Sequence, residues 1–186
     1  MGARLFTAVL PPAFVVEELA TWLEPRRDAG AEVWRWTPPE AWHLTTAFMA
    51  SVPEAAFDGL VEGLAEAAAR IGPFEVRVEG AVCFPDAARA RLLALGVTDG
   101  HERLAELAGV CRGVASHSGA APDGERFRGH LTLGRARRPL DATRWVHVLD
   151  AFPGWTWRAD EVVLVESHLG DRGSRYHVVE RFALAG

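Results

Sequence analysis

Residues 43–46, His-Leu-Thr-Thr, and residues 130–133, His-Leu-Thr-Leu, carry the same His-Leu-Thr tripeptide in the two halves of the 186-residue chain. Two copies are improbable by chance, because the sequence holds only 7 histidines. Each copy lies in a stretch with β-strand character, and side chains alternate between the two faces of a strand. The histidine and threonine of each copy therefore share one face, while the leucine between them points to the other.

The segments around the two tripeptides alternate between strand and helix patterns, separated by proline and glycine turns. We expect strands at 5–10, 34–36, 42–49, 74–84, 91–97, 127–135, 156–168 and 175–184. We expect helices at about 14–23, 54–70, 100–114 and 140–152, a loop at 116–125 and a turn at 170–173. This irregular order with hairpins predicts an α+β fold of mainly antiparallel sheets, and no interdomain linker is visible.

The composition excludes several kinds of chemistry. All 20 cationic side chains are arginine, since the sequence contains no lysine. A lysine-containing P-loop, a Schiff base to pyridoxal phosphate and a lysyl-nucleotide ligase intermediate are therefore excluded. The two cysteines, Cys83 and Cys111, have no CxxC spacing, so we expect neither a disulfide framework nor a cysteine-built zinc site.

Charge and hydropathy place the protein in an aqueous compartment. The net charge of -5 at pH 7 argues against broad electrostatic attraction to nucleic acid, so any polyanion has to bind at a local site. The first residues have no signal-peptide pattern, and no apolar run approaches membrane-spanning length. We expect a cytoplasmic protein that does not contact a membrane.

Two imidazoles and two hydroxyls that converge on one point suit a phosphate ester. A neutral imidazole can take a proton from attacking water, and an imidazolium can protonate the departing ribose oxygen. The hydroxyls can donate hydrogen bonds to the phosphate oxygens. Because the ordinary histidine pKa is about 6.5, both protonation states are accessible near neutral pH, and we expect a bell-shaped pH dependence.

Arginines gather around the second tripeptide and form a local basic patch in an acidic protein. They are Arg126, Arg128, Arg135, Arg137, Arg138 and Arg144. Only Glu125 and Asp141 oppose them within that stretch. Arg135 is the favoured stabiliser of phosphate charge, although strict alternation places it on the face opposite His130. Its role beside the histidine therefore requires the strand to end or twist.

The sequence resembles the 2H phosphoesterases, and within them the bacterial RNA 2′,3′-cyclic phosphodiesterases once called 2′-5′ RNA ligases. The resemblance is carried by 4–12, 36–48, 127–135, Glu166, Ser167 and Tyr176. It implies a bilobal fold in which two antiparallel sheets with pseudo-twofold symmetry flank a central cleft and helices lie outside. It also implies that residues 1–186 are one domain of two lobes, with one HxTx motif per lobe at 43–46 and 130–133.

The resemblance also implies the activity and the site. RNA ends or small nucleotides with a 2′,3′-cyclic phosphate are hydrolysed to 2′-phosphomonoesters, with His43 as proton donor and His130 as proton acceptor. Thr45, Thr132 and Arg135 bind the phosphate. No cofactor, metal or protein partner is implied. Ligation through a lysyl intermediate is impossible in this chain, so we expect hydrolysis in RNA processing.

Several interpretations stay open beside this one. Phe6 and Phe48 are candidates for stacking on a nucleobase. The chain departs from the family pattern at Thr46, Ala50 and Gly129, which could alter strand ends or substrate fit. The alternatives are a nucleotide- or RNA-end-binding module without turnover, a 2H enzyme acting on 2′-5′ linkages or ADP-ribose cyclic phosphate, and a metal-dependent hydrolase.

Overall fold

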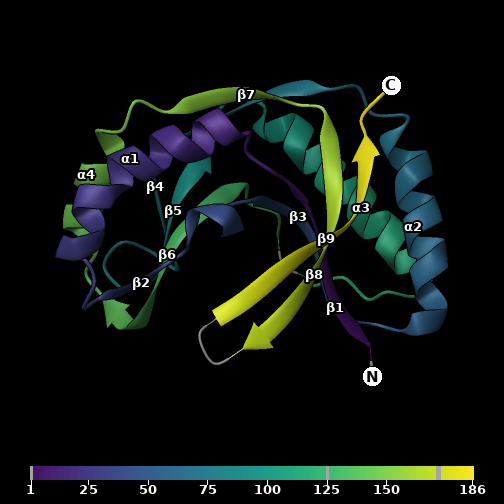
Figure 1. Ribbon diagram of the computed structural model, residues 1–186, viewed down its shortest axis with the longest axis horizontal. Coiled ribbons are helices and arrows are strands. Elements are labelled where there is room, and N and C mark those ends of the chain that lie inside the picture. The colour runs from purple at the N-terminus through teal and green to yellow at the C-terminus, as the bar shows by residue number, and fades with distance from the viewer. Residues whose placement is uncertain (1, 125, 171–172) are drawn as a thin grey trace.

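The computed structural model describes residues 2–124, 126–170 and 173–186, and its order of elements confirms the α+β class (Figure 1). In chain order the elements are β1 (Ala3–Val9), α1 (Ala13–Ala29), β2 (Trp34–Trp36), the 3-10 helix η1 (Pro39–Ala41), β3 (Leu44–Val52), α2 (Glu54–Ala68), β4 (Phe74–Phe84), β5 (Ala90–Val97), α3 (His101–Ser118), β6 (His130–Leu140), α4 (Thr143–Asp150), β7 (Trp155–Ala159), β8 (Glu161–Gly170) and β9 (Gly173–Ala183). Residues 125, 171 and 172, which belong to the expected loop and turn, lie outside the described residues.

The strands pair into one antiparallel sheet in the order β7-β4-β5-β6-β3-β1-β8-β9, with β2 added on β6. The two halves of this sheet meet between β3 and β6 at one residue pair, Leu44 opposite Leu131. The two sheets that we expected are therefore joined into one. The joining residues are the central leucines of the two tripeptides. Because an antiparallel pair of equivalent residues has a local twofold axis, this seam relates the two motifs by pseudo-twofold symmetry.

A β-bulge follows each tripeptide. On β3 the extra residue is Thr46, since its two neighbours pair with consecutive residues of β1. On β6 the extra residue is Leu133, since its two neighbours pair with consecutive residues of β5. A bulge shifts the alternation of side chains by one residue. The residues five positions after each histidine, Phe48 and Arg135, are thereby returned to the face of the histidines.

The helices lie on the outside of the sheet, as expected. Figure 1 shows α1 and α4 at one side of the molecule and α2 and α3 at the other. Helix α3 packs against β3, α2 packs against α3, and α4 packs against β4. Leu44 and Leu131 are fully buried in the hydrophobic core, so the leucines of the tripeptides anchor the sheet while their neighbours face the other side.

Some boundaries differ from those that the sequence predicts. The single strand expected at 156–168 is split into β7, which pairs with β4, and β8, which pairs with β1 on the other half of the sheet. Helix α1 runs past Pro25 to Ala29, and α3 runs to Ser118 into the expected loop. In the described part of the chain, none of the helices has the length and apolarity that crossing a membrane requires.

Candidate active site

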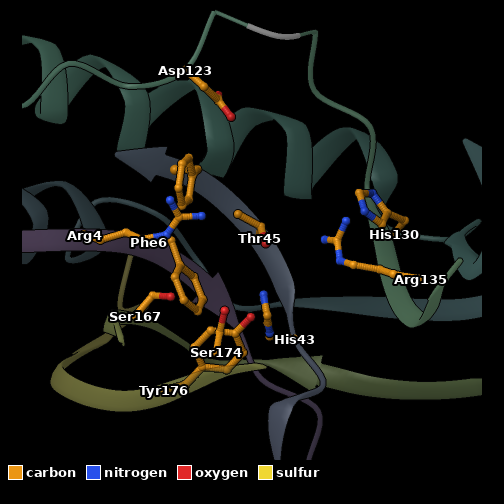
Figure 2. Close-up of a pocket in the computed structure, with 11 residues that line it drawn as sticks. Arg4, Phe6, His43, Thr45, Asp123, His130, Arg135, Ser167, Ser174 and Tyr176 are labelled. Carbon is orange, nitrogen blue, oxygen red and sulfur yellow. The ribbon is translucent and has the colours of Figure 1, made fainter. Parts of the chain in front are cut away.

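A cavity of about 430 Å³ lies on the face of the sheet that carries the two histidines (Figure 2). It is lined by Arg4, Phe6, His43, Thr45, Phe48, Asp123, His130, Arg135, Ser167, Ser174 and Tyr176. The cavity spans the seam, because one motif runs from His43 into β3 and the other opens β6. Residues from the two halves of the sequence are thus brought to one site.

His43 is held by its backbone and by an aromatic neighbour. Its Nδ1 donates a hydrogen bond to the carbonyl oxygen of Ala41 at 2.7 Å, which leaves Nε2 without a proton when the ring is neutral. The ring of Phe6 stacks on the imidazole with centroids 4.7 Å apart. Burial lowers the pKa of His43 to about 4, the hydrogen bond to Ala41 opposes this shift, and the charges of His130 and Arg135 add to it.

His130 is held in the same way. Its Nδ1 donates to the carbonyl oxygen of Arg128 at 2.7 Å, again two residues earlier in the chain. The ring of Phe84 lies beside the imidazole with centroids 4.8 Å apart. Burial lowers the pKa of His130, and the positive charges of Arg135 and Arg128 lower it further. Both imidazoles therefore present Nε2 to the cavity, and both are mainly neutral at pH 7 in the free protein.

The hydroxyl groups of the two motifs are placed differently. Thr45 lines the cavity, and the register at the seam puts it across from His130. Thr132 lies on the same face of β6 as His130 and across from His43, but it is not one of the cavity-lining residues. The predicted pair of hydroxyls is thus brought to the seam, with only Thr45 exposed to the cavity.

Arg135 enters the cavity because of the bulge at Leu133. Strict alternation predicts that Arg135 points away from His130, and the extra residue in β6 reverses that orientation. Figure 2 shows its guanidinium group pointing between the two histidines and toward Thr45. Arg137 and Arg138, farther along the same strand, do not line this cavity. The structure therefore singles out one arginine of the basic patch.

The two phenylalanines have different surroundings. Phe6 is only 4% exposed and contacts both His43 and Tyr176, so it packs against the imidazole of His43 and offers little surface to a ligand. Phe48 is half-buried, and the guanidinium of Arg4 lies 4.4 Å from its ring centroid. Of the two rings, Phe48 therefore has the more accessible surface, and stacking of a nucleobase stays a prediction.

Sequence reasoning missed other residues of the cavity wall, among them Arg4, Asp123 and Ser174. Alternation along β1 could have found Arg4, which lies two residues before Phe6 on the same face. Tyr176 belongs to the family resemblance but was given no role, and it packs edge-on against His43 at 5.3 Å. No group of three metal-ligating side chains occurs within the described ranges. Metal independence stays a prediction.

Comparisons with known proteins agree with this geometry. The model of the 2′-5′ RNA ligase superfamily matches residues 11–171. The RNA 2′,3′-cyclic phosphodiesterase of Thermus thermophilus is 33% identical over 191 residues, covering 98% of this chain and 91% of the relative. That of Aquifex aeolicus is 30% identical over 156 residues, covering 82% of each chain.

Solved structures extend the agreement to three dimensions. Escherichia coli LigT in its apo form has a TM-score of 0.79 at 25% identity, covering 100% of this chain and 99% of that one. A solved protein of Thermus thermophilus has a TM-score of 0.77 at 26% identity, with 98% of each chain covered. The resemblance to the 2H phosphoesterases is thereby confirmed, and the chain belongs to the 2′-5′ RNA ligase superfamily.

Proposed function

We propose that this protein is an RNA 2′,3′-cyclic phosphodiesterase that uses His43 and His130 as a metal-independent acid–base pair. One observation carries the proposal. Each imidazole has its Nδ1 fixed by the carbonyl two residues earlier, and both rings line the same cavity. Fixed Nδ1–H bonds leave both Nε2 atoms available for proton transfer at a single bound phosphate.

The reaction is an in-line displacement at phosphorus. Nε2 of neutral His130 takes a proton from water as the water oxygen bonds to phosphorus. The bond from phosphorus to the ribose O3′ breaks, and Nε2 of protonated His43 gives its proton to that oxygen. The product is a 2′-phosphomonoester. Arg135 and the hydroxyls of Thr45 and Thr132 stabilise negative charge on the nonbridging oxygens.

The donor role of His43 depends on the bound ester. In the free protein the low pKa of His43, about 4, leaves its imidazole largely neutral at pH 7. A phosphodiester anion between the two rings favours the imidazolium form and raises this pKa. Substrate binding therefore supplies the electrostatic condition under which His43 can carry the proton that it later donates.

The substrate class is supported by the relatives. Five curated relatives are named RNA 2′,3′-cyclic phosphodiesterase, at identities of 25–33%. Escherichia coli LigT has been solved in complex with 3′-AMP and with phosphate, at 26% and 25% identity to this chain. A nucleotide with a terminal phosphate group is the ligand that we infer for the cavity described above.

Phosphorus NMR of a nucleoside 2′,3′-cyclic phosphate, incubated with the protein in excess EDTA, tests the proposal. We expect the cyclic signal to be replaced by that of the 2′-phosphate, and not by that of the 3′-phosphate. An unchanged cyclic signal, with the nucleotide bound, would establish a binding module. Activity only after metal is restored would show a metal-dependent hydrolase. Parallel incubations with 2′-5′-linked dinucleotides and ADP-ribose cyclic phosphate distinguish the other 2H activities.

A further inference from the structure

A smaller cavity of about 140 Å³ continues the active-site cavity along β2. The two cavities share Arg135, Ser174 and Tyr176 as common walls. The smaller one is otherwise lined by Arg35, Trp36, Thr37, Pro38 and Ala41. The site therefore has two arms that diverge from the histidines, one toward Arg4 and Phe48 and the other toward Arg35.

Two arginines occupy opposed positions in the wall of the second arm. Arg35 of β2 is directly opposite Arg135 of β6 in the antiparallel register. Side chains at such positions leave the same face with Cβ atoms about 4.5–5.5 Å apart, and like charges there are unfavourable. Within the described ranges, neither arginine forms a salt bridge to a carboxylate. An anion bound between or beside them would relieve this repulsion.

The neighbouring aromatic residue is not free to stack on a base. The indole of Trp36 packs edge-on against Trp145 at 5.4 Å, and its Nε1 donates a hydrogen bond to the carbonyl oxygen of Arg27 at 3.0 Å. Arg27 in turn donates to the carbonyl oxygen of Thr37 at 3.1 Å. These contacts hold the wall of the second arm in place. Arg35 is the exposed side chain of β2 that can bind a ligand in this arm.

The shape of the proposed substrate matches the two arms. In a nucleoside 2′,3′-cyclic phosphate the base and C5′ are attached at opposite ends of the ribose, each next to one of the carbons that carry the cyclic ester. When the ester lies between His43 and His130, the base and the 5′ substituent must diverge. The arm with Arg4 on Phe48 offers a stacking surface, whereas the arm with Arg35 offers charge.

The geometry points to Arg35, together with Arg135, as a binding site for the phosphodiester on the 5′ side of the terminal nucleotide. The site thereby favours RNA ends over mononucleotides, since a nucleoside cyclic phosphate has no group to place in this arm. This inference rests on the proposed function, because it assumes a nucleotide at the histidines. It adds to that site a separate subsite for the phosphodiester one nucleotide upstream.

Binding of two products tests the inference without requiring turnover. Isothermal titration calorimetry compares a nucleoside 2′-phosphate with a dinucleotide that ends in the same nucleoside 2′-phosphate. We expect the wild-type protein to bind the dinucleotide more tightly. In Arg35→Ala the dinucleotide affinity falls about five- to tenfold, and the mononucleotide affinity falls less than about twofold. The slope of log Kd against log salt decreases by about 0.7 for the dinucleotide.

Arg158→Ala is the matched control, because it removes the same charge from β7 at the far edge of the sheet. We expect it to leave both affinities and the salt slope unchanged. Equal losses for both ligands in Arg35→Ala, or no loss for either, would overturn the inference. Selective loss of dinucleotide binding in Arg4→Ala instead would place the phosphodiester in the other arm. Failure of the proposed function would appear separately, as an absence of cyclic phosphate hydrolysis.

Discussion

The two histidines are alike in environment, and the proposed mechanism assigns each of them a different proton transfer. Replacing either with alanine removes a general acid or a general base, which contributes about 10²- to 10⁴-fold to a rate. We therefore expect His43→Ala and His130→Ala each to lower kcat on a nucleoside cyclic phosphate at least about 100-fold. Steady-state kinetics measure the loss, and thermal unfolding followed by circular dichroism checks the fold. Turnover near the wild-type value in one variant would remove that residue from the mechanism.

The lowered pKa values predict the pH dependence of kcat/KM, which reports the free protein. Below the pKa of His43, about 4, both imidazoles are protonated and no base is present. Above the pKa of His130, which burial also holds below 6.5, both are neutral and no acid is present. Between the two pKa values one proton is bound by the pair, and the active form is the minor one that carries it on His43. The two requirements together give kcat/KM a bell-shaped pH profile, whose maximum lies on the acid side of pH 7.

The profile of kcat should be displaced to higher pH, because the bound ester raises the pKa of the imidazole that carries the proton. Initial rates from pH 4 to 9 at limiting and saturating substrate give the two profiles. A kcat/KM that rises continuously through pH 8 would contradict the depressed pKa values. Coinciding profiles would show that the substrate has no effect on the ionisation of His43.

The bulge in β3 brings polar side chains into the core behind the site. Thr46, one of the positions at which the chain departs from the family pattern, shares a hydrogen bond with Thr7 of β1, with the two hydroxyl oxygens 2.7 Å apart. Burial raises the pKa of the nearby Cys111 thiol on α3, and the two threonine hydroxyls oppose this rise. The polar residue at 46 is thus matched by a polar residue on the adjacent strand.

Removing one of these two hydroxyls should lower the free energy of unfolding by more than half of the loss caused by removing both. Thr46→Val deprives the buried Thr7 hydroxyl of its partner, so we expect a loss of about 1–2 kcal/mol in the free energy of unfolding. Thr7→Val should cost a similar amount. The double variant should lose clearly less than the sum, because no hydroxyl of the pair is then left buried. Urea unfolding measures all four proteins, and strict additivity would show that the two hydroxyls are not coupled.

At the level of elements, the sequence predicted the strands that carry the motifs but not the bulges that complete the site. Alternation brings His43 and Thr45, or His130 and Thr132, to one face from local pattern alone. It places Phe48 and Arg135 on the wrong face, because a bulge is defined by pairing with a distant strand. For the same reason the division at Asp160 between β7 and β8 was missed, since those strands pair with opposite halves of the sheet.

At the level of the whole molecule, the site lies at the seam between β3 and β6, where a single residue pair joins the two halves of the sheet. The β3–β6 seam consists of one pair, Leu44 with Leu131, although the fully buried leucines belong to one continuous core. We interpret residues 1–186 as one domain of two lobes on this basis. A ligand that contacts β3 and β6 together adds connections across the seam, so binding and stability should be linked.

The linkage can be calculated for a bound anion. A ligand at 100 times its Kd adds about 2.7 kcal/mol to the free energy of unfolding. For a chain of this size, 1 kcal/mol corresponds to about 2–4 °C in Tm, so a saturating nucleoside 2′-phosphate should raise Tm by about 5–10 °C. Arg135→Ala should bind the phosphate more weakly and reduce that rise at the same ligand concentration, whereas Arg158→Ala should preserve it. Differential scanning calorimetry provides the comparison. An equal rise in wild type and Arg135→Ala would mean that the anion binds away from the seam, and the acid–base pair would then lose its substrate.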